Sequence, residues 1–133
     1  ENTEIKKQAV LPDKFPLNDN DFLPGNIVSE ITQTLKLLPP YTISITTLQE
    51  TKLNISKTEN TTIKELINQT VLGDQEFNFV FTSTVNFEFW SSSHISVKLN
   101  ETSIDDYLIN DGKAIRGSYE AEKSQLYLSF YKR

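Results

Sequence analysis

The stretch of residues 77–89 constrains the fold more than any other part of the chain, because its aromatic residues recur at every second position. The alternation runs through two triplets separated by Thr82-Ser83-Thr84, namely Phe77, Phe79 and Phe81, then Val85, Phe87 and Phe89. A period of two is typical of a β-strand that buries one face. The chain is therefore expected to contain a sheet whose core is rich in phenylalanine.

Further strands are expected on both sides of this stretch. Residues 41–55 begin with Tyr41, Ile43 and Ile45, which alternate with small polar residues. Residues 94–100 alternate in the same way. Residues 113–119 and 125–131 have strand patterns and are separated by a polar turn at residues 121–124. We expect these last two strands to form a β-hairpin.

Three segments are predicted to be helical. Residues 26–38 carry apolar residues three or four positions apart and end before Pro39-Pro40. Residues 62–71 open with a capping-box pattern, Thr62 and Glu65, and residues 103–108 open with the cap-like Ser103. The apolar side chains expected on the three helix faces are Ile27, Ile31, Leu35 and Leu38; Ile63, Leu66, Ile67 and Val71; and Ile104, Tyr107 and Leu108.

The order of these elements predicts an α+β fold, with a small mixed sheet covered by short helices on one face. A chain of 133 residues fits one domain with an adequate core, and we place that domain at residues 26–133, beginning with the first helix. Residues 1–25 contain three prolines and show little periodicity, so we expect an extended N-terminal arm or tether there.

Composition excludes several classes of function. Thirteen basic and eighteen acidic residues give a net charge of −5, and the lysines are scattered, so no nucleic-acid binding is expected. The absence of cysteine excludes disulfides, thiol catalysis and thiolate metal sites. No stretch reaches the roughly 18 apolar residues of a membrane span. Methionine is also absent, even at position 1, so we expect a mature or trimmed chain of secreted or periplasmic origin.

The sequence offers few candidates for catalysis or metal binding, and no cofactor is expected. His94 lies beside three serines, but a catalytic triad also needs a carboxylate and an oxyanion hole. Asp105, Asp106 and Asp111 are interpreted as acidic residues that favour a helix start. The acidic run at residues 18–21 lacks the glycine and glutamate of a calcium loop. Four glycosylation sequons are interpreted as chance patterns in an Asn- and Thr-rich chain, at Asn54, Asn60, Asn68 and Asn100.

The aromatic residues allow two interpretations. In the first, they form the core of a sheet that is partly covered on both faces. In the second, they form an exposed edge or patch that binds a protein partner, or the sheet edge accepts a partner strand by β-augmentation. For the second interpretation, the residues expected to contact the partner are Phe87, Phe89, Trp90, Leu126, Leu128 and Phe130.

Residues 77–131 resemble the short N-terminal domain shared by secretins and TonB-dependent receptors. The resemblance is carried by the strings FNFVFTSTV at residues 77–85 and ISVKLNETSIDDYL at residues 95–108, followed by the strand hairpin. Residues 42–71 match the first strand–helix half of such a domain. The arm and helix in front resemble DotD-, TcpQ- and BfpG-like periplasmic lipoproteins that accompany secretins. The resemblance implies a ring-building, partner-binding role without catalysis, and a lipidated cysteine upstream of this chain.

These expectations lead to a non-enzymatic, periplasmic assembly subunit of a secretin-containing type IV pilus or secretion system, anchored to the outer membrane. Its partners would be a secretin N-terminal domain or other envelope-complex subunits. An alternative is a secreted module that binds a small ligand in an aromatic-lined apolar or sugar-binding pocket. A third hypothesis is an enzyme with a centre at His94 or at a carboxylate.

Overall fold

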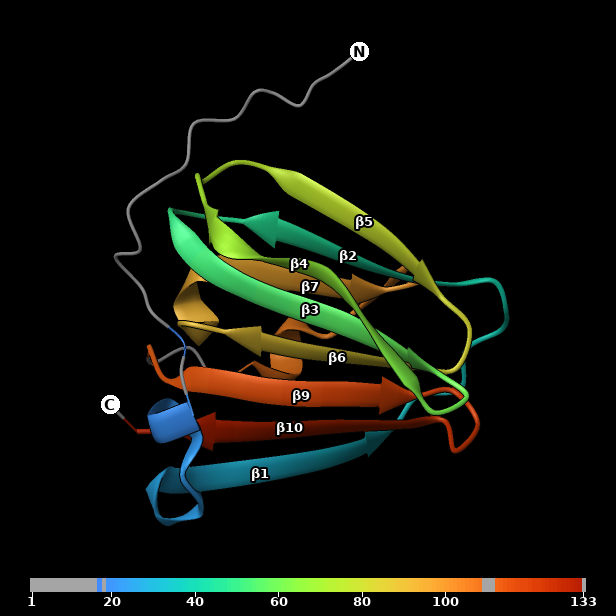
Figure 1. Ribbon diagram of the computed structural model, residues 1–133, viewed down its shortest axis with the longest axis horizontal. Coiled ribbons are helices and arrows are strands. Elements are labelled where there is room, and N and C mark those ends of the chain that lie inside the picture. Colours follow the sequence, from blue (N-terminus) through green and yellow to red (C-terminus); the bar gives the residue numbers. More distant parts are fainter. Residues whose placement is uncertain (1–16, 18, 109–111, 133) are drawn as a thin grey trace.

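The computed structural model describes residues 17, 19–108 and 112–132, and these form two antiparallel β-sheets joined by short turns (Figure 1). Sheet A has the strand order β1-β10-β9-β6-β3-β4, and sheet B has the order β5-β2-β7-β8. The strands of sheet A are β1 (Ile27–Thr34), β3 (Thr51–Glu59), β4 (Thr62–Val71), β6 (Thr84–Phe89), β9 (Ala114–Glu120) and β10 (Gln125–Tyr131). Those of sheet B are β2 (Tyr41–Thr47), β5 (Glu76–Phe81), β7 (Ile95–Leu99) and β8 (Thr102–Ser103).

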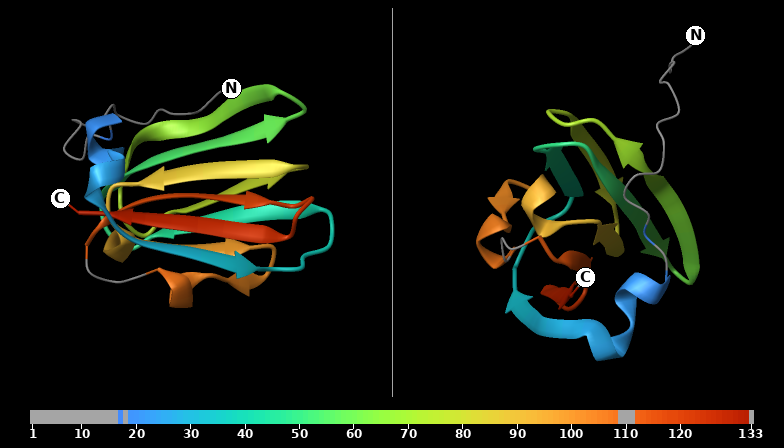
Figure 2. Two further views of the ribbon diagram at one scale, coloured as in Figure 1. Left: turned by 90° about the horizontal axis from the view of Figure 1, so that it is seen from below. Right: turned by 90° about the vertical axis from the view of Figure 1, so that its left-hand side faces the viewer.

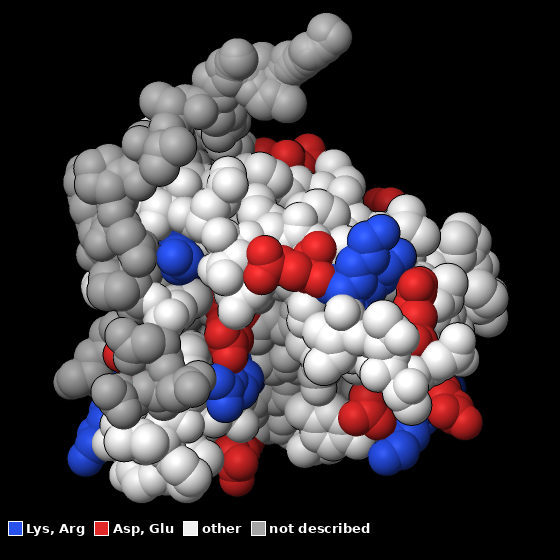
Figure 3. All heavy atoms as spheres, viewed as in Figure 1, with Lys and Arg blue, Asp and Glu red and all other residues white. Residues whose placement is uncertain are grey.

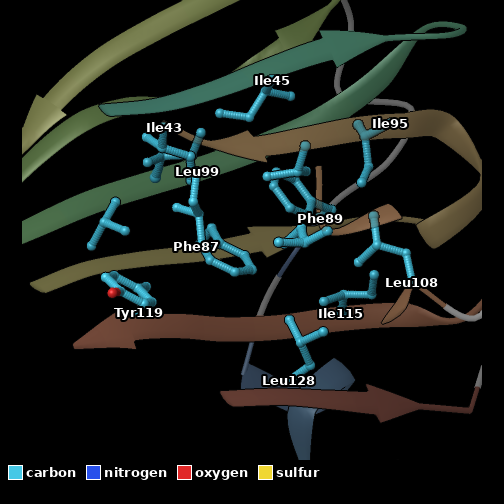
Figure 4. Packing of buried hydrophobic residues seen from close by; sticks show 14 of the residues in the cluster. Ile43, Ile45, Phe87, Phe89, Ile95, Leu99, Leu108, Ile115, Tyr119 and Leu128 are labelled. Atoms are coloured by element: carbon cyan, nitrogen blue, oxygen red, sulfur yellow. The ribbon is translucent and has the colours of Figure 1, made fainter. Parts of the chain in front are cut away.

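The two sheets face each other, and their inner side chains form one hydrophobic core (Figures 2 and 4). The chain crosses repeatedly from one sheet to the other, so strands that follow each other in sequence often lie in opposite layers. Alternation places every second residue of a strand in the core and its neighbours on the outside. The largest fully buried side chains are Tyr119, Phe81, Phe87, Phe89, Phe130, Ile43, Ile45, Leu53, Ile55, Leu99, Ile104 and Ile115.

The aromatic stretch at residues 77–89 forms two strands in different sheets. Its first half is β5, which pairs with β2, and its second half is β6, which lies between β3 and β9. Thr82 and Ser83 connect the two strands. The period-two prediction is confirmed for both halves. The strands predicted near residues 41, 95, 114 and 125 are also confirmed, and the last two pair as the expected hairpin.

The predicted α+β class is wrong, because both longer helices are strands. The segment assigned to the first helix contains β1, and the one assigned to the second is β4. A spacing of four residues, as between Ile27 and Ile31 or Ile63 and Ile67, is a multiple of two, so it fits a strand as well as a helix. Both segments are rich in isoleucine, valine and threonine, whose branched side chains favour strands. A secretin N-domain-like arrangement of helices on a sheet is therefore absent from the described residues.

The third predicted helix is a single 3-10 turn, η4 (Asp105–Tyr107). The cap-like residue found in the sequence does act locally, because the Ser103 hydroxyl accepts a hydrogen bond from the Asp105 amide at 3.2 Å. The turn ends at Leu108, whose buried side chain faces the core. A capping signal marks a turn start here, but the tertiary structure allows only one turn.

Two 3-10 turns, η1 (Asp19–Phe22) and η2 (Pro24–Asn26), precede β1 and pack at one end of sheet A (Figure 1). Phe22 is buried there and meets Tyr131 edge to face, with ring centroids 5.1 Å apart. These turns overlap the C-terminal end of the arm or tether predicted for residues 1–25. Residues 1–16 and 18, which belong to the same prediction, lie outside the described residues.

Candidate functional site

The candidate site is a groove of about 400 Å³ on the outer face of sheet A. That volume lies within the range of about 300–1,000 Å³ of small-molecule sites. Figure 3 looks onto this face and shows a hollow near its middle, with an acidic and a basic group in contact at its border. The groove residues come from β3, β6, β9 and β10 and are Asn54, Ser56, Asn86, Phe87, Glu88, Arg116, Gly117, Ser118, Tyr127 and Ser129.

The strand register arranges the outward side chains of the groove in two rows that cross the sheet. Pairing of β3 with β6, β6 with β9, and β9 with β10 fixes which residues stand opposite each other. Three of the outward side chains near the middle are serines, which are short and leave the hollow between longer neighbours. The first row is Asn54, Glu88, Arg116 and Ser129, and the second is Ser56, Asn86, Ser118 and Tyr127.

The first row contains a connected polar network centred on Glu88. One carboxylate oxygen of Glu88 accepts a hydrogen bond from the Asn54 amide nitrogen at 3.0 Å. The other oxygen accepts a hydrogen bond from Arg116 Nε at 2.8 Å and forms an ion pair with Arg116 Nη2 at 2.7 Å. The side chains of Glu88 and Arg116 are 22% and 43% exposed, so they are held in place but still reach solvent. The network is thus pre-positioned for contact with a molecule in the groove.

Arg116 is also held from the side of η1. The Phe22 ring lies against the guanidinium, with 4.3 Å between the Arg116 Cζ atom and the ring centroid. A cation over an aromatic face is attracted by the ring quadrupole. Because Phe22 is itself anchored against Tyr131, this contact connects the N-terminal turns to the groove. Arg116 therefore has two fixed partners, one acidic and one aromatic.

The second row ends at Tyr127, whose side chain is half-buried on the outer face. Tyr127 is diagonal to Arg116, because Tyr127 stands opposite Ser118 and Arg116 stands opposite Ser129. Such diagonal neighbours are roughly 7–8 Å apart, within reach of one small ring-shaped molecule. Among the described groove residues, Tyr127 is the one outward aromatic side chain. It offers an apolar ring face and a hydroxyl to a molecule in the hollow.

Two groups outside the groove have shifted pKa values. Burial raises the pKa of Tyr119, whose hydroxyl donates a hydrogen bond to the Leu35 carbonyl at 2.6 Å. The hydrogen bond from the Thr82 hydroxyl lowers the pKa of Glu59, and Lys57 adds to this effect. Tyr119 lies in the core and Glu59 at the end of β3.

Five of the six residues predicted to contact a protein partner lie in the core. Phe87, Phe89, Leu126, Leu128 and Phe130 are at most 1% exposed. They are buried because every second residue of β6 and β10 points to the inner face of sheet A. The sixth, Trp90, is half-buried after β6, and its ring stands 5.6 Å from that of His94. The structure therefore does not bring these six side chains together on one surface.

His94, the catalytic candidate of the third hypothesis, packs against Trp90 at the end of η3 (Ser92–His94). The nearby serines bond to each other, because the hydroxyls of Ser91 and Ser93 are 2.9 Å apart. Ser91 also accepts a hydrogen bond from the Ser93 amide at 3.2 Å. These contacts are those of a local turn.

Among the acidic residues singled out in the sequence, Asp105 has structural contacts. Asp105 accepts hydrogen bonds from the Val97 amide at 2.8 Å and from the Ser96 hydroxyl at 2.5 Å, which tie η4 to β7. Asp111 and the side chains of residues 18–20 lie outside what the structure describes. Within the described part of the chain, no group of three or more His, Asp or Glu side chains could hold a metal ion.

The four sequon asparagines occupy different places. Asn54 lies in the groove, and Asn68 is exposed on the edge strand β4. Asn60 turns the β3–β4 hairpin with a φ of 60°, a left-handed conformation that asparagine tolerates. Asn100 donates to the Leu38 carbonyl and accepts from the Thr42 amide, both at 2.9 Å. Two of them thus have evident structural roles in turns.

Sequence reasoning missed the groove because it followed the apolar phase of the strands. The polar residues that line the groove occupy the opposite phase of β6, β9 and β10, where they look like ordinary solvent-facing residues. A usable signal exists: Asn86 and Glu88 in one strand, and Arg116 and Ser118 in another, are polar outward pairs two positions apart. Their proximity depends on strands β6 and β9 being neighbours, which the sequence pattern does not reveal.

Comparisons with models of protein families, with curated proteins and with solved structures find no match. The family resemblance of the sequence strings therefore receives no support from them. No helix within the described ranges combines the length and hydropathy needed to cross a membrane. The site is thus interpreted from its own geometry.

Proposed function

We propose that this protein is a non-catalytic binding module that holds a small, polar, uncharged molecule in the groove on the outer face of sheet A. The observation that carries the proposal is the network of Asn54, Glu88 and Arg116 at the border of a 400 Å³ hollow. Polar side chains that bond to each other on rigid strands hold their positions before a ligand arrives. Binding then costs little ordering of the site.

The charge balance of the groove favours an uncharged ligand. Nε and Nη2 of Arg116 both contact one oxygen of Glu88, and the two side chains cancel each other's charge. An anion would have to compete with Glu88 for Arg116, and a cation would have to compete with Arg116 for Glu88. A neutral polar molecule can instead add hydrogen bonds to both groups without breaking the pair.

The proposal replaces the aromatic-lined pocket of the sequence-based alternative with a polar groove. The phenylalanines that were expected to line a pocket fill the core instead. Glu88 is the one carboxyl group among the described groove residues. Glycoside hydrolysis, for comparison, normally uses a pair of carboxyl groups. We therefore propose binding and release rather than chemical conversion.

Amide NMR spectra of ¹⁵N-labelled protein test the proposal. The protein is titrated with uncharged polar molecules, such as monosaccharides, disaccharides, polyols and nucleosides, and with the charged probes acetate, phosphate and glucosamine. We expect at least one uncharged probe to give saturable shifts confined to amides of β3, β6, β9 and β10. A Ser118→Trp variant, which fills the hollow, should remain folded and lose these shifts.

Ser44→Trp is the matched control. Ser44 is likewise a half-buried serine on an outer sheet face, but it lies in β2 of sheet B and bonds to Asn78 at 2.6 Å. This variant should bind as the wild-type chain does. Shifts centred on other strands, a preference for the charged probes, or a complete lack of saturable shifts would each contradict the proposal.

A second candidate function is binding of a protein strand along β4, which would serve the assembly role predicted from the family resemblance. Among the described strands, only β3 pairs with β4, so the other edge of β4 presents backbone donors and acceptors over ten residues. Ile63 on this edge is 70% exposed. A free edge of this length is suited to β-augmentation.

A pull-down from envelope extract tests this second candidate. Recovery of a secretin or another secretion subunit by the wild-type chain would support it and the periplasmic location that comes with it, if recovery is lost with Asn68→Pro in β4, because strand alternation places the Asn68 N–H on the unpaired edge. A proline within the edge removes one backbone donor and adds a bulky ring. Failure to recover any such subunit, or equal recovery by the variant, would count against strand pairing.

A further inference from the structure

We propose that the ligand of the groove is a saccharide, with one sugar ring stacked on Tyr127 and its hydroxyl groups bound by Asn54, Glu88 and Arg116. This inference rests on the proposed function and names its ligand class. It follows from three properties of the described groove residues, namely their mixed hydrogen-bonding capacity, the single outward aromatic ring, and the extent of the groove across the sheet.

The hydrogen-bonding capacity of the groove matches hydroxyl groups. A sugar hydroxyl both donates and accepts, so its site needs donors and acceptors close together. Glu88 keeps acceptor positions beyond those used by Asn54 and Arg116, because a carboxylate has about four lone-pair sites. Arg116 and Asn54 also keep N–H donors beyond those used in the network, because a guanidinium has about five N–H groups and a side-chain amide has about two. Neighbouring hydroxyls of one ring could therefore bind to an acceptor and a donor at once.

The remaining groove residues extend this pattern. Ser56, Ser118 and Ser129 add hydroxyls that can donate or accept, and Asn86 adds an amide. A fatty acid or another apolar ligand would leave these groups without partners, which is costly when they are covered. A phosphate-bearing nucleotide would need a free cation, but Arg116 is already paired.

Tyr127 supplies the apolar contact that a sugar ring needs. A pyranose has a face of C–H groups as well as its hydroxyls, and an aromatic ring can cover that face while its own hydroxyl remains in water. Tyr127 stands one strand away from Arg116 and is diagonal to it, so the stacked ring would reach the polar network of the first row. Ser118, which stands opposite Tyr127 on the adjacent strand β9, is small and leaves room for that ring above the sheet.

The groove is longer than one sugar ring. Its residues span four neighbouring strands, and three strand spacings of roughly 4.8 Å give about 14 Å across the sheet. An oligosaccharide of two or more residues would therefore use more of the groove than a monosaccharide. We expect disaccharides to bind more tightly than their component sugars.

Calorimetric titration and the amide NMR titration, performed with glucose, maltose, cellobiose, lactose and diacetylchitobiose, test the inference. We expect at least one disaccharide to bind in the groove with higher affinity than its monosaccharide. Tyr127→Ala should weaken that affinity by about tenfold or more, and Tyr127→Phe should retain most of it because the ring remains. Tyr107→Ala, a half-buried tyrosine of η4, serves as the matched control and should bind normally.

A charge-switch variant sharpens the test. Glu88→Gln leaves Arg116 without its acidic partner, so binding of the neutral disaccharide should weaken, and binding of an acidic disaccharide such as digalacturonate should strengthen. A wild-type preference for the acidic sugar would overturn the inference. Equal binding by Tyr127→Ala and the wild-type chain would also overturn it.

The two proposals fail in distinguishable ways. Groove shifts with polyols or nucleosides but with none of the saccharides would overturn the saccharide inference and leave the binding module standing. If no probe shifts the groove amides, or if Ser118→Trp leaves all binding unchanged, both proposals are wrong.

Discussion

The two faces of sheet A are built from the same strands but carry opposite chemistry. In β6, Phe87 and Phe89 point into the core, while Glu88 between them points into the groove. In β10, Leu126 and Leu128 are buried, while Tyr127 between them lies on the outer face. The inner face therefore holds the sandwich together, and the outer face is available for binding.

The comparison shows why the groove can be polar without weakening the fold. Inner side chains lose contact with water on folding, and each large apolar one contributes about 1.5–3 kcal/mol through burial. Outer side chains keep part of their hydration, so their ion pairs contribute little to stability. Substitutions on the inner face should thus lower stability, and substitutions on the outer face should change binding.

The largest effect is expected for Phe87→Ala. Phe87 is 1% exposed and stacks on Phe89, with ring centroids 5.4 Å apart, so its removal leaves a cavity between the sheets. The free energy of unfolding should fall by about 3–5 kcal/mol, measured by denaturant titration. A loss below about 1 kcal/mol would contradict the described packing.

Gly117→Ala should cause the next largest loss of stability. The added Cβ atom would come within 2.5 Å of Phe87 Cε1 and 2.8 Å of Leu128 Cδ2, because Gly117 stands between these two side chains on the inner face. We expect a loss of about 1–3 kcal/mol from overpacking. Ser118→Ala, one residue away on the outer face, is the control, and the same unfolding midpoint for both variants would argue against this difference between the faces.

Tyr119→Phe should lower stability by about 1 kcal/mol at neutral pH, since it removes the hydrogen bond to the Leu35 carbonyl. It should also change the response to alkali. Burial raises the pKa of Tyr119 above the ordinary value of about 10, so the unfolded chain releases this proton first. The wild-type chain is then fully stabilised below about pH 10 and loses that stability as the pH rises towards the folded-state pKa.

Denaturant titrations from about pH 8 to about pH 11 measure this response. The wild-type chain should lose stability with pH more steeply than Tyr119→Phe, and Tyr107→Phe should behave as the wild-type chain does. Equal slopes for the wild-type chain and Tyr119→Phe would show that the Tyr119 phenol is not buried in its neutral form.

The smallest effect on stability is expected for Glu88→Gln. The pair with Arg116 is partly exposed, and such pairs contribute about 0–1 kcal/mol, less at high salt. The unfolding midpoint should therefore change little while ligand binding changes. A loss as large as that of Gly117→Ala would mean that the network serves the fold rather than a ligand.

The sequence predicted much of the strand structure, because alternation over five to seven residues is a local property. The strands β2, β5, β6, β7, β9 and β10 all follow it. The prediction was wrong at β1 and β4, because a four-residue spacing fits both a helix and a strand and cap-like residues favoured a helix. At β1, pairing with β10 along the whole strand decides between helix and strand.

The groove could not be predicted from the sequence for a related reason. Its residues come from β3, β6, β9 and β10, and β3 is more than 60 residues from β10 along the chain. No local pattern states that β6 lies between β3 and β9. The same missing information led the partner-contact prediction to residues such as Phe89 and Leu128, which the second sheet covers.

The sequence by itself determined which residues alternate, where several strands begin and end, and that phenylalanine supplies much of the buried surface. These features depend on backbone geometry and on the local order of apolar and polar side chains. The tertiary structure alone decided which strands are neighbours, which phase faces the core, and that Asn54, Glu88 and Arg116 meet. The physical reason is that sheet pairing and sheet packing join residues far apart in sequence, and their free energy depends on the whole assembled core.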